Sequence, residues 1–128
     1  MGWPTYDNDE VLKVSEILSS GLVNYWTGNE GKNFEKEFAL WSENKFAIAL
    51  SNGTVALELA LRGLGVAAGD EVLVTPRSFI ASSSCVVNVG ASPVFVDVDP
   101  IFGTICPKSI RRHITQKTKA IICVHLGG

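Results

Sequence analysis

The chain has 128 residues, the size of one ordinary domain with a buried core. Hydrophobic residues make up 46% of it and charged residues 19%, which indicates a soluble globular protein. The net charge of −2 gives no general attraction to nucleic acid or membranes, and no apolar run reaches the ~18 residues that a transmembrane helix needs.

The three cysteines lie among apolar residues and show neither CxxC nor Cys/His ligand spacing. This pattern predicts buried free thiols in a reducing compartment and no metal site. The N-terminus has neither the basic region nor the apolar region of a secretory signal. We therefore expect a cytoplasmic protein.

Two helices are predicted near the start of the chain. The first spans residues 10–19, with Asn8 or Asp9 as its cap and Gly21 just past its end. The second spans residues 33–41, where aromatic residues recur at helical spacing.

Between these helices, residues 22–32 bring aromatic side chains and glycines together. Aromatic residues beside flexible glycine favour a loop that contacts a ligand or partner. A loop packed on its own domain is the alternative.

The clearest chemical signal follows the second helix. The apolar residues 46–50 predict a strand, residues 51–54 (Ser-Asn-Gly-Thr) a turn, and residues 55–61 a nearly all-apolar, buried helix. The first N–H groups of a helix lack intrahelical partners and carry partial positive charge. Because Gly53 allows close approach and the Thr54 hydroxyl is a donor, the turn predicts an anion site. The alternative is that its polar residues only cap the helix.

The rest of the chain alternates strands with helices. Strands are predicted over residues 71–75, 93–98 and 120–124, and helices over residues 80–89 and 107–114. The strands are continuously apolar, so we expect a parallel α/β sheet covered by helices on both faces. Ligands gather at the carboxyl ends of such strands, which favours phosphate binding by the Ser-Asn-Gly-Thr turn over capping alone.

Three blocks of sequence carry a family resemblance: SNGTVALELALRGLGVAAGDEVLVTPRSFIAS, GASPVFVDVDP and TKAIICVHLGG. In this order and spacing they resemble the N-terminal part of the DegT/StrS-type aminotransferases, pyridoxal 5′-phosphate (PLP) enzymes that aminate keto sugars attached to nucleotides. The resemblance covers nearly the whole chain. It implies part of the fold type I large domain, a three-layer αβα structure with a mainly parallel sheet. Residues 1–45 would supply helices and a contact loop, and residues 46–128 the start of the sheet.

The resemblance also implies roles for single residues. Gly53, Thr54 and the backbone N–H of Val55 match the loop that holds the cofactor phosphate, and Phe79 matches the residue that stacks on the pyridine ring. A loop near the substrate at the dimer interface is matched by four consecutive residues: Tyr25, Trp26, Thr27 and Gly28. His125 matches a strand end of the family, where it could approach the cofactor; a histidine satisfied at the strand end is the favoured interpretation.

Two features of the family are absent from the sequence. The Schiff-base lysine and the aspartate that pairs with the pyridine nitrogen belong beyond residue 128, and Lys108, Lys117 and Lys119 do not match the lysine motif. The sequence therefore contains no catalytic residue of the family. Because it stops two glycines after a predicted buried strand, we expect a truncated chain.

The first hypothesis is the N-terminal fragment of a PLP-dependent aminotransferase for nucleotide-linked keto sugars, with glutamate as amino donor. Such an enzyme would serve cell-surface polysaccharide or related sugar biosynthesis. The alternatives are a PLP-dependent sugar dehydratase on the same scaffold and a non-catalytic binding or assembly fragment. The resemblance implies a homodimer, and the charge balance predicts no nucleic-acid or membrane partner.

Overall fold

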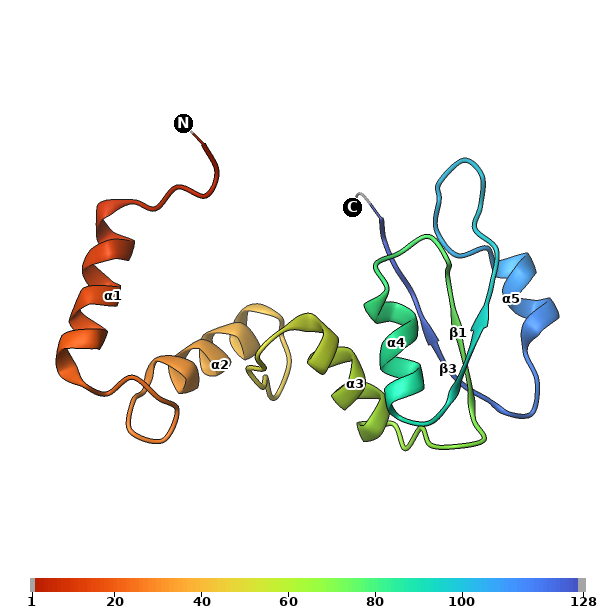
Figure 1. Cartoon of the computed structure of the whole chain (residues 1–128), viewed down its shortest axis with the longest axis horizontal. Helices are drawn as coiled ribbons and strands as arrows, with labels where there is room; N and C mark the ends of the chain where they lie inside the picture. Colours follow the sequence, from red (N-terminus) through yellow and green to blue (C-terminus); the bar gives the residue numbers. More distant parts are fainter. Residues whose placement is uncertain (1, 127–128) are drawn as a thin grey trace. The chain divides into compact units, whose positions relative to one another are not determined.

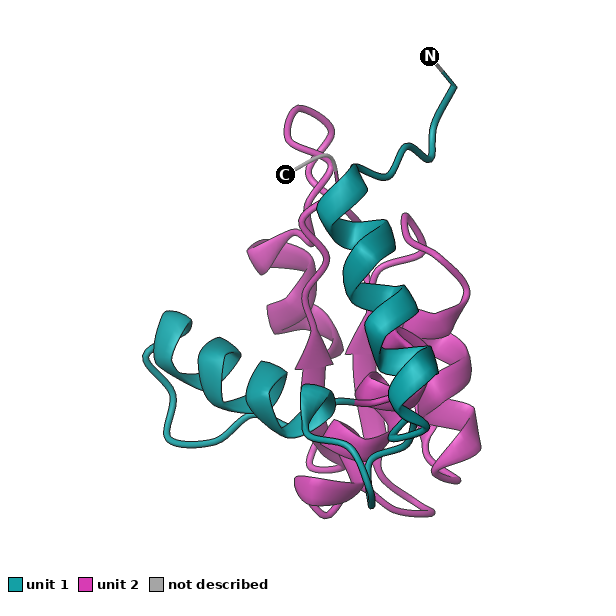
Figure 2. Cartoon of the chain, turned by 90° about the vertical axis from the view of Figure 1, so that its left-hand side faces the viewer, with its two compact units in different colours: residues 1–49 teal, residues 50–128 magenta. Residues whose placement is uncertain are grey.

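The computed structural model describes residues 2–126, which form two compact units (Figure 2). Unit 1 is Met1–Ala49 and unit 2 is Leu50–Gly128. Unit 1 is helical, whereas unit 2 combines helices with a sheet (Figure 1).

Unit 1 begins with helix α1 (Asn8–Ser20). Its cap is Asp7, so the expectation of Asn8 or Asp9 is wrong. The Asp7 carboxylate accepts from the Glu10 N–H at 2.9 Å, and the Glu10 carboxylate accepts from the Asp7 N–H at 2.8 Å. Only Asp7 has Glu10 three residues ahead, which is the spacing that this reciprocal pair of hydrogen bonds requires.

Gly21 ends α1 in the left-handed conformation, as predicted, with its N–H donating to the Leu18 carbonyl. Helix α2 (Glu30–Trp41) follows and starts three residues earlier than expected. Gly31, interpreted as part of a loop, lies in the first turn of this helix, where a glycine costs only about 1 kcal/mol relative to alanine.

Residues 46–50 do not form the predicted strand and carry no regular secondary structure. A strand needs a hydrogen-bonded partner, and the three described strands pair with one another. Instead, the Ala49 N–H donates to the Glu35 carboxylate of α2 at 2.8 Å. Phe46 and Ile48 are 75% and 71% exposed, so an apolar sequence alone does not make a strand here.

Unit 2 contains the sheet and the helices that cover it. Its elements are α3 (Gly53–Gly63), β1 (Glu71–Val74), α4 (Ala81–Asn88), β2 (Ser92–Phe95), α5 (Pro107–His113) and β3 (Thr118–Ile122). The strands lie where they were predicted, with shifted ends. Strand β2 ends before residue 98 because the chain leaves the sheet, and Val98 pairs with Ile105 in an antiparallel bridge.

The strand order is β2-β1-β3, and both pairs are parallel, which confirms the predicted parallel α/β class. The connection from β1 to β2 runs across the sheet in one direction, and the connection from β2 to β3 runs back across it in the opposite direction. Because crossovers between parallel strands are right-handed, α4 and α5 must lie on opposite faces of the sheet. Figure 1 shows α4 and α5 on the two sides of the sheet.

Strand β1 carries the core of unit 2. Its residues Val72, Leu73 and Val74 are fully buried, because β1 is paired on both sides and covered on both faces. Val72 and Val74 point to the same face, as residues two apart in a strand do. On that face they join a buried cluster that includes Leu61 of α3 and Val86 of α4.

Helix α3 is not buried all round, contrary to expectation. Leu61 is its buried residue, whereas the side chains of Val55 and Leu59 are 41% and 45% exposed. Its principal packing partner is α4. One apolar side of α3 is therefore left uncovered by the described chain.

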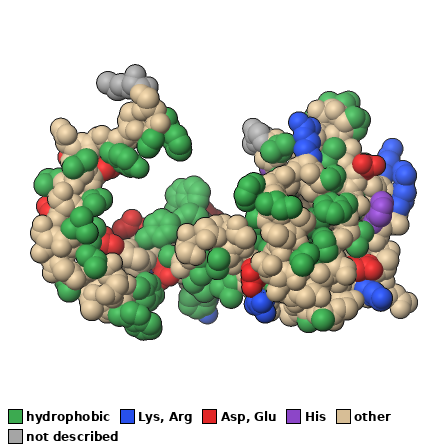
Figure 3. Space-filling view, in the orientation of Figure 1, with side chains coloured by type: hydrophobic (Ala, Val, Ile, Leu, Met, Phe, Trp, Pro, Cys, Tyr) green, Lys and Arg blue, Asp and Glu red, His purple; other side chains and the backbone are tan. Residues whose placement is uncertain are grey.

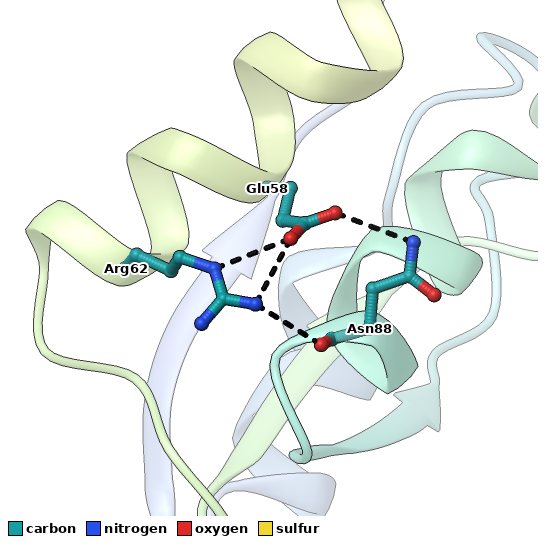
Figure 4. Close-up of polar contacts among 3 residues, drawn as sticks. All are labelled: Glu58, Arg62 and Asn88. Atoms are coloured by element: carbon teal, nitrogen blue, oxygen red, sulfur yellow. Dashed lines mark hydrogen bonds and ion pairs between the residues drawn. The ribbon is translucent and has the colours of Figure 1, made fainter.

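A polar network ties the C-terminal half of α3 to the end of α4 (Figure 4). The Arg62 guanidinium donates to Glu58 at 3.2 and 3.0 Å and to the Asn88 carbonyl at 3.3 Å. The Asn88 amide donates in turn to the second Glu58 oxygen at 3.3 Å. Carbonyl groups in the last turn of a helix lack intrahelical partners, and Arg62 donates to one of them at the end of α4. The network therefore fixes the relative position of the two helices.

Apolar side chains are also exposed in unit 1, and Figure 3 shows hydrophobic groups at the surface of both units. Helix α1 has no buried residue, and its Val14 and Leu18 are 57% and 66% exposed. Among the described helices, none has the length and hydropathy to cross a membrane.

We expect Gly28→Ala to destabilise the protein by about 1–3 kcal/mol, the usual cost of overpacking. Gly28 is buried, and a Cβ added to it would run into the backbone carbonyl oxygens of Leu22 and Asn24. The urea midpoint of unfolding measures this. Gly63→Ala is the control, because a Cβ there meets nothing within 4 Å and should leave stability unchanged or raise it. Equal midpoints for both variants would contradict the close packing of the loop.

Candidate functional site

An open hollow of about 620 Å³ lies between the first turns of α3 and α4 in unit 2. Its lining residues come from α3, from the loop after β1 and from α4: Gly53, Thr54, Ala56, Leu57, Phe79, Ala81 and Ser82. The volume is in the range of small-molecule sites, about 300–1,000 Å³. Because the loop after β1 leaves the carboxyl end of that strand, the hollow lies at the edge where parallel α/β sheets bind ligands.

The first turn of α3 offers hydrogen-bond donors to the hollow. Asn52 caps the helix, with its side-chain oxygen accepting from the Val55 N–H at 3.0 Å. The N–H groups of Gly53 and Thr54 have no acceptor within the helix, since its ladder starts later. With the partial positive charge of the helix end, they favour an anion in front of the turn.

The space in front of this turn is free. A Cβ added at Gly53 would meet no atom within 4 Å, so the glycine leaves its backbone open to a ligand. The Thr54 side chain is half-buried and adds a hydroxyl donor beside it. This corner of the hollow therefore fits a phosphate group.

Phe79 borders the hollow with a ring that is 75% exposed. The loop that carries Phe79 is anchored by a hydrogen bond of 2.6 Å between the hydroxyls of Ser78 and Ser82. Ser82 is buried and lies in α4, so the bond ties the loop to the helix. An exposed aromatic face on a fixed loop can stack on a flat ring.

No residue that lines the hollow carries a charge. Its electrostatics therefore come from the helix N-termini, which favour a negative group at one corner, while Leu57 and Phe79 provide apolar surface. The arrangement can bind a flat, apolar ring that carries a phosphate. Among residues 2–126, no group of three or more His, Cys, Asp or Glu side chains is placed to hold a metal ion.

Three of the residues assigned to the cofactor, Gly53, Thr54 and Phe79, meet at this hollow. Val55 does not line it, and the cap occupies its N–H, so Asn52 would have to release that group before it bound a phosphate. Ser82 and its neighbour Ala81 were missed by sequence reasoning. The small-residue run after Phe79 is the signal that could have indicated a helix packed closely behind the site.

The predicted substrate loop belongs to unit 1 and is tightly organised. The Asn24 side chain accepts from the N–H groups of Trp26 and Thr27 at 3.0 and 3.1 Å, and its carbonyl accepts from the Gly28 N–H at 2.7 Å. Trp26 is 87% exposed, so its indole is free for contact. Gly28 is buried against backbone, which makes its role in this unit structural.

The hydroxyl of Tyr25, in the same loop, donates a hydrogen bond to the Glu35 carboxylate at 3.0 Å. This hydrogen bond, together with the negative charge of Glu35 and a small loss of solvation, raises the pKa of Tyr25 above its usual value. Tyr25 is therefore a neutral donor at physiological pH.

Two residues near the strand ends have other environments. His125 follows β3 and is exposed. The Asp99 carboxylate accepts from the N–H groups of Ile101 and Phe102 at 2.9 and 3.1 Å and so organises a turn.

Comparison with known proteins gives the family. Residues 4–128 match the DegT/DnrJ/EryC1/StrS aminotransferase family. GDP-perosamine synthase from Escherichia coli O157:H7 is 41% identical over 128 residues, which cover 98% of this chain and 35% of the relative.

Two solved structures show the same fold. The aminotransferase from Psychrobacter cryohalolentis superimposes with a TM-score of 0.96 at 56% identity, over 100% of this chain and 32% of that protein. NtdA from Bacillus subtilis with bound cofactor PMP superimposes with a TM-score of 0.85 at 35% identity, over 94% of this chain and 28% of that protein.

The chain thus spans about a third of the length of the relatives that it matches. Within that span the match runs through both units and includes every residue of the hollow. The chain belongs to the DegT/DnrJ/EryC1/StrS aminotransferase family.

Proposed function

We propose that the whole protein is a PLP-dependent aminotransferase that moves an amino group from glutamate to a keto sugar linked to a nucleotide. The observation that carries the proposal is the hollow at which Gly53, Thr54 and Phe79 meet, in a chain of this aminotransferase family. The GDP-perosamine synthase and the PMP-bound relative support the sugar substrate and the cofactor.

The residues of the hollow fit the cofactor. Thr54 and the open backbone at Gly53 would hold its phosphate, and the exposed face of Phe79 would stack on its ring. When bound, PLP supplies an electron sink for the bonds at the reacting amine.

The chain itself positions that cofactor and holds its non-reacting parts. Hydrogen bonds to a charged phosphate stabilise it by about 1.5–3 kcal/mol each. Stacking adds about 0.5–1.5 kcal/mol beyond the buried area. The hydrogen bond between Ser78 and Ser82 ties the loop that carries Phe79 to α4, so the backbone of this loop would be positioned before the ligand arrives.

We also infer a cytoplasmic location. The three cysteines of the described chain are free. Burial raises the pKa of the Cys85 thiol, which makes it unreactive. Cys106 is half-buried and Cys123 is exposed, so the expectation that all three are buried is wrong. Free thiols are typical of reducing compartments.

The function is tested with the purified whole protein, ¹⁵N-glutamate and a panel of GDP- and UDP-linked keto sugars. We expect ¹⁵N in the sugar product, detected by mass spectrometry, with one 2-oxoglutarate released for each amino sugar formed. A product that has lost oxygen without gaining nitrogen would instead identify a dehydratase.

The phosphate corner is tested by Thr54→Val in the PLP-loaded whole protein. We expect PLP to bind about 10- to 150-fold more weakly, because a charge-assisted hydrogen bond of about 1.5–3 kcal/mol is lost. Phe79→Ala should weaken binding less, by roughly two- to twelvefold from stacking alone. Cofactor absorbance after dialysis reports both effects.

Thr104→Val is the matched control, because Thr104 lies outside the hollow and loses the same hydroxyl. It should retain PLP as the parent does. If Thr54→Val also retains PLP like the parent, the Ser-Asn-Gly-Thr turn is only a helix cap.

We further propose that the whole protein is a homodimer. The uncovered apolar surface of α1, where Val11, Val14 and Leu18 are all more than half exposed, supports an additional packing partner. Light scattering after size exclusion should give twice the monomer mass. A monodisperse monomer over the micromolar range would exclude the dimer.

A further inference from the structure

A second hollow, of about 330 Å³, lies entirely within unit 1. Helix α2 provides one wall, and the segment after it provides the other. The side chains that give the hollow its chemistry are Tyr25, Lys32, Glu35, Lys36, Lys45 and Phe46. We name it the lysine hollow.

Aromatic rings position two of its ammonium groups. Lys32 Nζ lies 5.5 Å from the centroid of the Tyr25 ring, and Lys45 Nζ lies 5.2 Å from that of Phe46. Both distances are within reach of a cation–π attraction. The rings therefore hold these charges at the hollow.

The lysines of the hollow lack carboxylate partners within the described chain. The ion pairs among the described residues join Lys13 to Glu30 and Arg62 to Glu58, and none of these residues lines the lysine hollow. Lys32, Lys36 and Lys45 thus place three positive charges at one hollow, where they repel one another. A bound anion would relieve this repulsion.

The one carboxylate of the hollow is already engaged. Glu35 accepts from the Tyr25 hydroxyl with one oxygen, at 3.0 Å, and from the Ala49 N–H with the other, at 2.8 Å. Both of its oxygens therefore have a partner, and among the described residues no ion pair joins Glu35 to a lysine of the hollow. Three lysines and one glutamate leave the hollow with a net charge of +2.

We propose that the lysine hollow binds a diphosphate group. A diphosphate inside a larger molecule carries one negative charge on each phosphate, which matches the net charge of the hollow. Lysine binds phosphate oxygens as a point charge, and three lysines can contact both phosphates. The volume admits a diphosphate and part of what it is attached to.

The same diphosphate chemistry has two sources, inorganic pyrophosphate and a nucleoside diphosphate. A nucleotide-linked sugar as the natural source rests on the proposed function, whereas the lysine hollow itself rests only on the contacts within unit 1. The two ideas can therefore fail separately.

The test is calorimetric titration of the PLP-loaded whole protein, in which the cofactor occupies the phosphate corner of unit 2. The probes are inorganic pyrophosphate, GDP and guanosine. We expect pyrophosphate and GDP to bind and guanosine not to bind, with affinity falling as salt is added. Tighter binding of GDP than of pyrophosphate would identify a nucleotide as the source, and equal binding would identify the free anion.

Variants locate the signal. Lys32→Met, Lys36→Met and Lys45→Met should each weaken pyrophosphate binding by about two- to fivefold, as expected for exposed charge pairs. The triple methionine variant should weaken it more than tenfold. Lys13→Met, also in unit 1, and Lys108→Met, in unit 2, are the controls and should bind as the parent does.

Two further variants separate charge from packing. A triple Lys→Arg variant keeps the positive charges and should retain binding. Glu35→Gln removes the negative charge, and its amide can still accept from Ala49 and donate to the Tyr25 oxygen, so binding should tighten about twofold. Parental affinity in the triple methionine variant would overturn the lysine hollow. Absence of amino transfer with pyrophosphate binding retained would overturn only the proposed function.

Discussion

The parallel pairing of β1 with a strand on each side is the constraint on which unit 2 depends. It requires both connections to cross over the sheet, and right-handed crossovers then put α4 and α5 on opposite faces. The fully buried side chains of β1 are a consequence of that position. The loop after β1 leads directly into α4, so this loop and the first turn of α4 lie at the carboxyl edge of the sheet. The site is built at that edge.

The two ends of the α3–α4 pair have different roles. Their C-terminal halves are locked by the Glu58–Arg62–Asn88 network, which is partly solvent-exposed and so contributes more to position than to stability. Their first turns enclose the hollow, with no charged side chain in its lining. The N-termini of the two helices supply the partial positive charge at the hollow. The polar network near their C-termini fixes the position of one helix relative to the other.

The two units differ in how much they bury. Unit 2 has a cluster of buried residues around β1, whereas Ala39 is the buried residue of the two helices of unit 1. Unit 1 is instead held by polar contacts, with Asn24 organising its loop and Glu35 joining that loop to the segment after α2. Its apolar helix faces remain available for further packing, and its lysines remain available for an anion.

The sequence by itself determined the features that depend on neighbours along the chain. Gly21 as a helix end, the three strands of unit 2 and the parallel class could be predicted, because periodicity and end signals are local. The Ser-Asn-Gly-Thr turn could also be identified as a helix start with free donors, and the family resemblance indicated Phe79 as its companion. Even the Asp7–Glu10 pair was readable from its spacing, although the prediction placed the cap one or two residues late.

Only the tertiary structure decided what depends on residues far apart in sequence. Residues 46–50 have strand composition but no described strand to pair with, so the Ala49 N–H bonds to Glu35 instead. The hollow exists because α3 and α4 pack side by side, which brings Ser82 of α4 to the same hollow as Gly53 and Thr54 of α3. Lys45 joins Lys32 and Lys36 only through the path of the chain after α2. Strand pairing, helix packing and charge clustering are contacts across space, and local sequence preference does not encode which partners will meet.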